Sequence, residues 1–427
     1  MTIALFSSEF PPFNNHGGIG TFMAQLAKTL TAMGHEVIVF IDGGSSLYCA
    51  VPYDNYTIVP FLNSYNSTYI RSFTSWLPHR LILRFLNKYA PELTTLFGYN
   101  LLTFLTFIAY RKHADIHTIH TPVLFAPAYL ISLLFPSITV ITHAQGPDEL
   151  LQSYNWNSWG CMLKAQIETS YMKHSRYIVA CSQTIYTYLK TRHQTARGKL
   201  INIPNFVDTK IFPVPKKNVD TNKIIFFGRM EYRKGPDLVV KAFAQLARQH
   251  HKLKLICIGE DPYAWKVGNL FCTFSQYVDS LNLAPTILNR ISFVPRIDER
   301  STLIKYLTKN RGIAILPSRF EPFGFVFLEA MMTGSITVAS KNGGGSEIIQ
   351  NAVDGFTVNP SVKSIVACIH KIKSLRSREI EAITRRARKT VQNKYDISYA
   401  TRAYKSLYRN TTILSHPTFH SRSNISV

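Results

Sequence analysis

Two glutamates and two basic residues have types and spacings that suit the binding of a phosphorylated sugar. Glu321 and Glu329 lie eight positions apart in PSRFEPFGFVFLEAMMTGSITVASKNGGG, residues 317–345. Arg229 and Lys234 lie five positions apart in GRMEYRKG, residues 228–235. Carboxylates accept hydrogen bonds from hydroxyls, an arginine can bind two phosphate oxygens at once, and a lysine acts as a point charge. Together these residues indicate a site for a sugar nucleotide.

Short apolar runs that predict β-strands precede both pairs. IIFFG (224–228) comes before Arg229, and GIAILPS (312–318) comes before Glu321. Similar runs recur with helical stretches between them, at 3–8, 35–41, 116–121, 138–144, 177–182, 200–205, 253–259, 290–295, 336–340 and 355–359. This alternation predicts βαβ units and parallel sheets, in which ligands bind beyond the carboxyl ends of the strands.

The length and composition of the chain predict two globular domains. Its 427 residues are too many for one ordinary core, and 46% of them are hydrophobic against 17% charged. The stretch 213–223, PVPKKNVDTNK, has no periodicity and is interpreted as a linker. We therefore predict an N-terminal Rossmann-like domain at 1–212, a C-terminal one at 224–411 and a flexible tail at 412–427. The final helix could pack back on the N-terminal domain.

The formal net charge of +23 favours an anionic partner. Lysines and arginines exceed acids by 5 in residues 1–210 (15 against 10) and by 18 in residues 211–427 (33 against 15). The densest run, RRARK at 385–389, suits either a solvated helix face or a surface that holds anionic lipid. Because the sequence has no RRM, zinc-finger or helix-turn-helix signature, we expect no nucleic acid partner.

Several negative features narrow the class of protein. The six cysteines form no CxxC pair, which favours a reducing compartment, and the N-terminus has no signal-peptide pattern. Residues 121–142 carry no charge over a length that could cross a bilayer, but three prolines divide them. A helix followed by a buried strand is the preferred interpretation. No DxD or HExxH metal-binding pattern occurs.

Two further motifs follow strand-like runs in the N-terminal half. Gly17 and Gly18, in NHGGIG (15–20), precede a helical stretch, where glycines let a ligand approach the backbone and free N–H groups face an anion. His143 follows ITVIT. Structural explanations exist for all these motifs: a turn with positive φ, a packed histidine, a solvated basic loop, and glutamates that serve only their helix.

The order and spacing of the motifs resemble those of glycosyltransferase family 4, the retaining enzymes of the GT-B fold. The resemblance covers roughly residues 1–410 and rests on GGIG, the ITH strand end, IPNFVD (203–208), GRMEYRKG, LPSRFEPFGFVFLEAM and GGGSEII (343–349). The sequence departs from the family at Phe206, where glycine is common, and at IGEDPY (258–263), which replaces a glycine-rich segment. The implied fold is α/β, with two doubly wound Rossmann-like domains facing across a cleft. The N-terminal domain would hold the acceptor and the C-terminal domain the donor.

The resemblance implies a role for each charged residue of the two pairs. Arg229 and Lys234 would bind the diphosphate of the donor and stabilise its departing charge, as a metal does in other transferases. Glu321 would contact hydroxyls of the sugar, and Glu329 would contact the ribose.

The resemblance assigns the remaining motifs to the same donor. His143 would help to orient the sugar, and Gly17 and Gly18 would let the first domain close over the phosphates. Backbone N–H groups around Phe323, Gly324 and Phe325, and around 343–345, would line the sugar and phosphates.

We therefore expect a retaining hexosyltransferase that uses a UDP- or GDP-sugar, with no metal and no cofactor besides this co-substrate. Its acceptor would be a glycan, a lipid-linked sugar or a polysaccharide precursor, and its location the cytoplasm, at the inner face of an anionic membrane. A GT-B-like nucleotide-sugar epimerase and a non-catalytic subunit that binds a nucleotide sugar are the alternatives. The epimerase is disfavoured because the pairing of two glutamates with two cations matches transferases. The non-catalytic subunit is disfavoured because such a subunit usually loses these residues, and all four are present.

Overall fold

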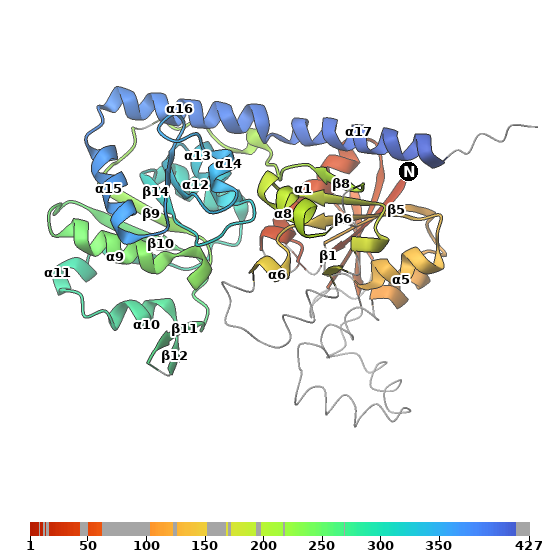
Figure 1. Ribbon diagram of the computed structural model, residues 1–427, viewed down its shortest axis with the longest axis horizontal. Helices are drawn as coiled ribbons and strands as arrows, with labels where there is room; N and C mark the ends of the chain where they lie inside the picture. Colours follow the sequence, from red (N-terminus) through yellow and green to blue (C-terminus); the bar gives the residue numbers. More distant parts are fainter. Residues whose placement is uncertain are drawn as a thin grey trace, which may run out of the picture.

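The computed structural model describes residues 1–7, 9–11, 13, 17–42, 50–61, 103–122, 126–151, 168–169, 172–193, 198–216, 218–268 and 270–415. Two open sheets lie side by side in it, each with helices packed around it (Figure 1). Asn15 and His16 of the first glycine motif lie outside the described residues, as do residues 62–102 and residues 416–427 of the expected tail.

The N-terminal sheet has eight strands in the order β3-β4-β2-β1-β5-β6-β7-β8. Its strands are β1 (Thr2–Ser7), β2 (Glu36–Asp42), β3 (Val51–Tyr53), β4 (Tyr56–Phe61), β5 (Ile116–Pro122), β6 (Thr139–Ala144), β7 (Tyr177–Ala180) and β8 (Leu200–Asn202). All neighbours pair in parallel except β3 and β4. Ile3 and Leu5 enter the apolar cluster on one face of this sheet, and Ala4 and Phe6 enter the cluster on the other. Burial on both faces explains the continuous apolar run of β1.

The C-terminal sheet has six parallel strands in the order β13-β10-β9-β14-β15-β16. Its strands are β9 (Lys223–Phe227), β10 (Lys254–Ile258), β13 (Ile291–Val294), β14 (Ile313–Leu316), β15 (Ile336–Ser340) and β16 (Phe356–Val358). A separate antiparallel hairpin joins β11 (Trp265–Val267) and β12 (Leu270–Cys272). The order of the six strands is the doubly wound Rossmann order, so the prediction of an α/β fold with two such sheets is confirmed.

The helices connect and cover the strands. They are α1 (Gly18–Ala32), α5 (Ala126–Leu134), α6 (Asp148–Leu151), α8 (Gln183–Arg192), α9 (Pro236–Ala247), α10 (Phe274–Asp279), α11 (Pro285–Leu288), α12 (Arg300–Lys309), α13 (Phe325–Met332), α14 (Gly345–Ile348), α15 (Val362–Lys373), α16 (Ser377–Lys394) and α17 (Ile397–Ser415), with 3-10 turns η3 (Thr209–Ile211) and η4 (Tyr232–Lys234). The uncharged stretch 121–142 contains α5 and the start of β6. No described helix combines the length and the apolar character that a bilayer-spanning segment needs.

Helices α16 and α17 run along both sheets, one after the other (Figure 1). Helix α16 packs against α13 of the C-terminal half, whereas α17 contributes Ala400, Tyr404 and Leu407 to the apolar cluster of the N-terminal sheet. The chain therefore crosses between the halves twice. At the crossing, the Val207 N–H donates to the Tyr395 carbonyl at 2.9 Å, and the Ile397 N–H donates to the Val207 carbonyl at 3.0 Å. The two crossing segments are thus hydrogen-bonded to each other.

Candidate active site

The two predicted charged pairs come from one edge of the C-terminal sheet. Strands β9 and β14 are hydrogen-bonded neighbours, and the chain moves away from them in opposite directions across the sheet. Ligands bind beyond the carboxyl ends of the strands at such a switch point. Arg229 and Lys234 follow β9, and Glu321 follows β14.

The loop after β9 turns sharply because of one glycine. Residues Tyr232–Lys234 form η4, and Gly235 ends it with φ of 73° before Pro236 begins α9. A Cβ atom on Gly235 would lie 2.6 Å from the carbonyl oxygen of Pro317 in the loop after β14. The glycine therefore permits both the left-handed backbone and the close approach of the two loops.

Backbone contacts with a third loop, which follows β15, fix the position of Glu321. The Glu321 N–H donates to the Asn342 carbonyl at 3.2 Å, and the Gly344 N–H donates to the Glu321 carbonyl at 2.8 Å. Gly343 has φ of 98°, and a Cβ there would lie 2.1 Å from the Glu321 carbonyl oxygen. Gly343 and Gly344 of the GGGSEII motif therefore pack against the backbone of Glu321 and fix its position.

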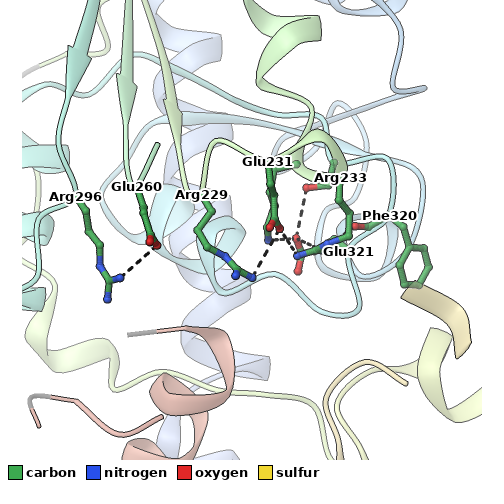
Figure 2. A network of polar contacts seen from close by, with 9 residues as sticks. Arg229, Glu231, Arg233, Glu260, Arg296, Phe320 and Glu321 are labelled. Atoms are coloured by element: carbon green, nitrogen blue, oxygen red, sulfur yellow. Dashed lines mark hydrogen bonds and ion pairs between the residues drawn. The ribbon is translucent and has the colours of Figure 1, made fainter. Parts of the chain in front are cut away.

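Side chains from these loops form a network of charges (Figure 2). The Lys234 ammonium donates to Oε2 of Glu321, which also accepts from the Ser318 hydroxyl at 3.4 Å. The Arg233 guanidinium donates to the Phe320 carbonyl at 3.1 Å and lies 3.7 Å from the same Glu321 oxygen. Glu321 is thus held by two cations and a hydroxyl.

Glu231 extends this network toward Arg229. Its Oε1 accepts a hydrogen bond from Arg233 at 2.7 Å and lies 3.7 Å from Nη2 of Arg229. The Arg229 side chain is 54% exposed, whereas those of Lys234 and Glu321 are 16% and 9% exposed. Arg229 is therefore the cation of this group that is open to a ligand, and Lys234 is already paired.

The predicted site glutamates have opposite electrostatic environments. Burial raises the pKa of Glu321, but Lys234 and Arg233 outweigh burial, and its pKa lies below the ordinary value. Burial also raises the pKa of Glu329, which lies on α13, and Arg300 only partly opposes this, so that pKa stays above the ordinary value. Nη2 of Arg300 lies 3.0 Å from Oε1 of Glu329.

The stretch between the glutamates starts α13 and meets the N-terminal half. Gly324 caps the helix with φ of 96°, and Phe323 is buried against Phe325 and Tyr395, with ring centroids 5.7 and 5.9 Å away. The Ser182 hydroxyl, at the start of α8, donates to the Pro322 carbonyl at 2.6 Å.

Glu347 of α14 makes a further contact between the halves, at the start of α8. Its carboxylate accepts from the backbone N–H groups of Gln183 at 2.7 Å and Thr184 at 2.5 Å. A carboxylate is favoured at a helix N-terminus, where N–H groups lack intrahelical partners.

The glycine motif of the N-terminal half faces a carboxylate of the same chain. Gly17 caps α1 and Gly18 begins it, and the Gly20 N–H donates to the Glu9 carboxylate at 3.4 Å. A Cβ on Gly17 would lie 2.1 Å from Oε2 of Glu9. This oxygen ends a flexible side chain that can rotate away, so the contact with Glu9 does not by itself require a glycine at position 17.

The structure buries His143 in the core of the N-terminal half. Its Nε2 lies 2.8 Å from Nδ1 of His120, whose Nε2 lies 2.5 Å from the Tyr408 hydroxyl of α17. Burial lowers the pKa of His143 to about 3. The Phe22 ring packs on it with centroids 4.9 Å apart, and Nδ1 has no partner among the described residues. His143 is therefore neutral, and these contacts are with the core rather than with the charge network of Figure 2.

Several residues of the site were not predicted from the sequence. Arg233 lies inside GRMEYRKG, and its place beside Lys234 was the available signal. Arg319 forms a two-point contact with Asp237, at 2.9 and 2.7 Å, and lies over the Tyr232 ring at 3.6 Å. Arg300 has no local pattern that could have identified it.

Phe206, which stands where glycine is common in the family, is a core residue. Its ring packs near Phe22 and Tyr404, with centroids 6.2 and 6.5 Å away.

Two family models match the chain in succession. The model described as Glycosyltransferase Family 4 matches residues 16–211, and the model described as Glycosyl transferases group 1 matches residues 207–390. The glycogen synthase of Mycobacterium tuberculosis is 24% identical over 388 residues, which cover 87% of this chain and 86% of the relative.

Solved glycosyltransferase structures share the fold. The sucrose-phosphate synthase of Thermosynechococcus elongatus has a TM-score of 0.74 at 20% identity, over 97% of this chain and 100% of that one. The Anabaena protein HepE in complex with UDP-glucose has a TM-score of 0.63 at 15% identity, over 96% of this chain and 100% of that one. The protein thus has the GT-B fold and belongs to glycosyltransferase family 4, within the group 1 glycosyl transferases.

Proposed function

We propose that the protein is a retaining hexosyltransferase that takes a sugar from a UDP- or GDP-sugar without a metal ion. The observation that carries this proposal is the contact between Lys234 and Glu321 at the switch point of the C-terminal sheet, with Arg229 exposed beside it. A sugar nucleotide needs cations for its phosphates and acceptors for its hydroxyls, and this edge of the sheet offers both.

When a donor binds, the contact between Lys234 and Glu321 would be replaced by contacts of each residue with the donor. The Lys234 ammonium would turn from Glu321 to a phosphate oxygen, and Glu321 would accept from a sugar hydroxyl. Arg229 would add a second cation to the phosphates. Positive groups fixed in place before the reaction stabilise a departing nucleotide without further reorganisation. HepE was solved with UDP-glucose, which supports UDP-sugars as the first donors to test.

A thermal-shift screen with UDP-, GDP- and ADP-sugars tests the donor, because a ligand that binds only the folded protein raises its melting temperature. We expect a rise with UDP- or GDP-sugars that the free sugar does not cause. Radiolabelled transfer to a lipid extract then tests the acceptor, and NMR of the product's anomeric proton tests retention. An inverted anomeric configuration in the product would overturn the retaining mechanism.

The proposed acceptor is a lipid-linked or polysaccharide precursor at an anionic membrane in the cytoplasm. The net charge of +23 supports this location. In the basic run of α16, Arg385, Arg386 and Lys389 are exposed, but Arg386 already donates to the Val353 carbonyl at 2.6 Å, and the half-buried Arg388 donates to the Pro213 carbonyl at 3.2 Å. Sedimentation with phosphatidylglycerol vesicles at low salt should therefore fall in an Arg385→Gln/Lys389→Gln double variant. If wild-type protein does not sediment with such vesicles, the membrane location is excluded.

A further inference from the structure

Two helices at the ligand-binding edge of the C-terminal sheet bring together one more ion pair. Arg300 is the first residue of α12, shortly after β13, and Glu329 lies on α13, which follows β14. Nη2 of Arg300 lies 3.0 Å from Oε1 of Glu329. Both helices begin at the edge where Lys234 and Glu321 meet.

The Glu329 carboxyl is placed where an ionised group is costly without a partner. Its side chain is 10% exposed, and burial raises its pKa. Arg300 is the charged group that lowers this pKa. From α16, Arg388 also meets α13, but it donates to the Met332 carbonyl at the C-terminal end of that helix. The ionised form of Glu329 therefore depends on Arg300.

The Arg300 guanidinium retains donors that the rest of the described chain does not use. Its Nε and Nη2 are buried and have no hydrogen-bond partner among the described residues, so the contact with Glu329 is an ion pair without hydrogen-bond geometry. Arg319, by contrast, directs both terminal nitrogens at the Asp237 carboxylate. Buried donors are usually paired, so the unpaired nitrogens of Arg300 mark its contact with Glu329 as an electrostatic one.

We propose that Arg300 is a positioning residue that keeps Glu329 ionised and directed at the ribose of the donor nucleotide. This inference rests on the proposed function, in which Glu329 accepts hydrogen bonds from the ribose hydroxyls. The ionised carboxylate is acceptor-only and can accept from the hydroxyls with both oxygens, whereas protonation turns one oxygen into a donor. A neutral residue at position 300 would leave Glu329 protonated at a higher pH and reduce nucleotide binding there.

The first test needs no nucleotide. Protein labelled with ¹³C at the glutamate carboxyls is titrated by NMR, and Glu329→Gln identifies the resonance. We expect Arg300→Gln to raise the Glu329 pKa, Arg300→Lys to restore much of the wild-type value, and Lys305→Gln, an exposed change on the same helix, to leave it unchanged. An unchanged Glu329 pKa in Arg300→Gln overturns the inference, whatever the protein binds.

The second test measures UDP and GDP affinity by calorimetry against pH. Each unit by which Arg300→Gln raises the Glu329 pKa should weaken binding by up to about tenfold at pH values below both pKa values, and the affinity should approach that of wild type as pH rises. A merely structural role would weaken binding equally at every pH, and that result also overturns the inference. A raised Glu329 pKa together with unchanged affinity for both nucleotides would instead overturn the donor site of the proposed function.

Discussion

The Lys234 ammonium donates a hydrogen bond to the Glu321 carboxylate across 87 positions of the chain. The parallel pairing of β9 with β14 makes this contact, because it places the loops after both strands at one edge. Both side chains are largely buried, so each neutralises a charge that the interior would otherwise disfavour. The sequence predicts that these same two residues face the donor. The pair that stabilises the two loops is therefore also the pair that is proposed to bind the donor.

Removal of either partner should abolish most of the transfer activity. We expect Lys234→Ala and Glu321→Ala each to lower turnover about a hundredfold or more, the scale for loss of a preorganised electrostatic contact. Initial rates with the donor found in the thermal-shift screen provide the measurement. Lys363→Ala, an exposed change on α15, is the control and should keep wild-type turnover. Full turnover in a folded Lys234→Ala or Glu321→Ala protein would contradict the site assignment.

The same pair predicts a pH-dependent stability. The pKa of Glu321 is lowered on folding, so its carboxylate stabilises the fold above its ordinary pKa of 4.5, and this stabilisation is lost as pH falls through the lowered value. Glu321→Gln should therefore cost about 3 kcal/mol near pH 7, the scale for breaking a buried pair, and less at acid pH. Urea unfolding of both proteins at pH 7 and at acid pH measures how the loss of unfolding free energy changes with pH.

Glu379→Gln serves as the control for that measurement. Its pKa is also lowered, to about 2, by hydrogen bonds from Arg376, but the side chain is exposed on α16. Solvent screens such a pair, so its loss should change the unfolding free energy little. An equal loss in Glu321→Gln and Glu379→Gln, or a loss in Glu321→Gln that does not depend on pH, would refute the argument.

Gly343→Ala should destabilise the protein and displace Glu321. The backbone at Gly343 is left-handed, and a Cβ would lie 2.1 Å from the Glu321 carbonyl oxygen, so the loop after β14 has to move. We expect a loss of about 1–3 kcal/mol in unfolding free energy, the usual scale of backbone strain, and lower turnover. Gly198→Ala is the matched control, because no atom lies within 4 Å of the added Cβ. If both variants unfold alike, the proposed support of Glu321 by Gly343 is wrong.

Chelation of metal should leave the reaction rate unchanged. Arg229 and Lys234 would supply the positive charge that a divalent ion supplies in other transferases. Initial rates before and after EDTA treatment, followed by addition of Mg²⁺ or Mn²⁺, are the measurement. Loss of activity with EDTA that either ion restores would show that the cations alone do not suffice.

The sequence predicted the sheets well because their strands are apolar on both faces. Runs such as IALFSS and IIFFG appear as β1 and β9. Strands β3 and β4 and the β11–β12 hairpin were not predicted, and four of the six hairpin residues are exposed to solvent. Helix α17 continues to Ser415, beyond the start of the expected tail.

Candidate site residues could be predicted where they lie in local sequence motifs. Contacts between distant elements could not be predicted. Arg229, Lys234 and Glu321 were predicted because each follows a recognisable strand, and the structure brings them into one charge network, while their roles stay a prediction. The contact of Arg300 with Glu329 joins two helices whose spacing no local pattern records. The burial of His143 could not be predicted, because its ring packs near Tyr404 of the last helix, with centroids 6.2 Å apart, and its neighbour His120 contacts Tyr408 of the same helix.

That dependence has a consequence for how the chain folds as it is made. His120 and Tyr408 are hydrogen-bonded although 288 positions separate them, and Tyr404 lies fully buried in the same core. A ribosome releases the strands of the N-terminal sheet first, but their core stays incomplete until α17 has emerged. Domains of multidomain chains usually fold in the order of their synthesis. In this protein the N-terminal sheet reaches its final packing only with the last helix, so its core cannot be completed before the C-terminal half has been synthesised.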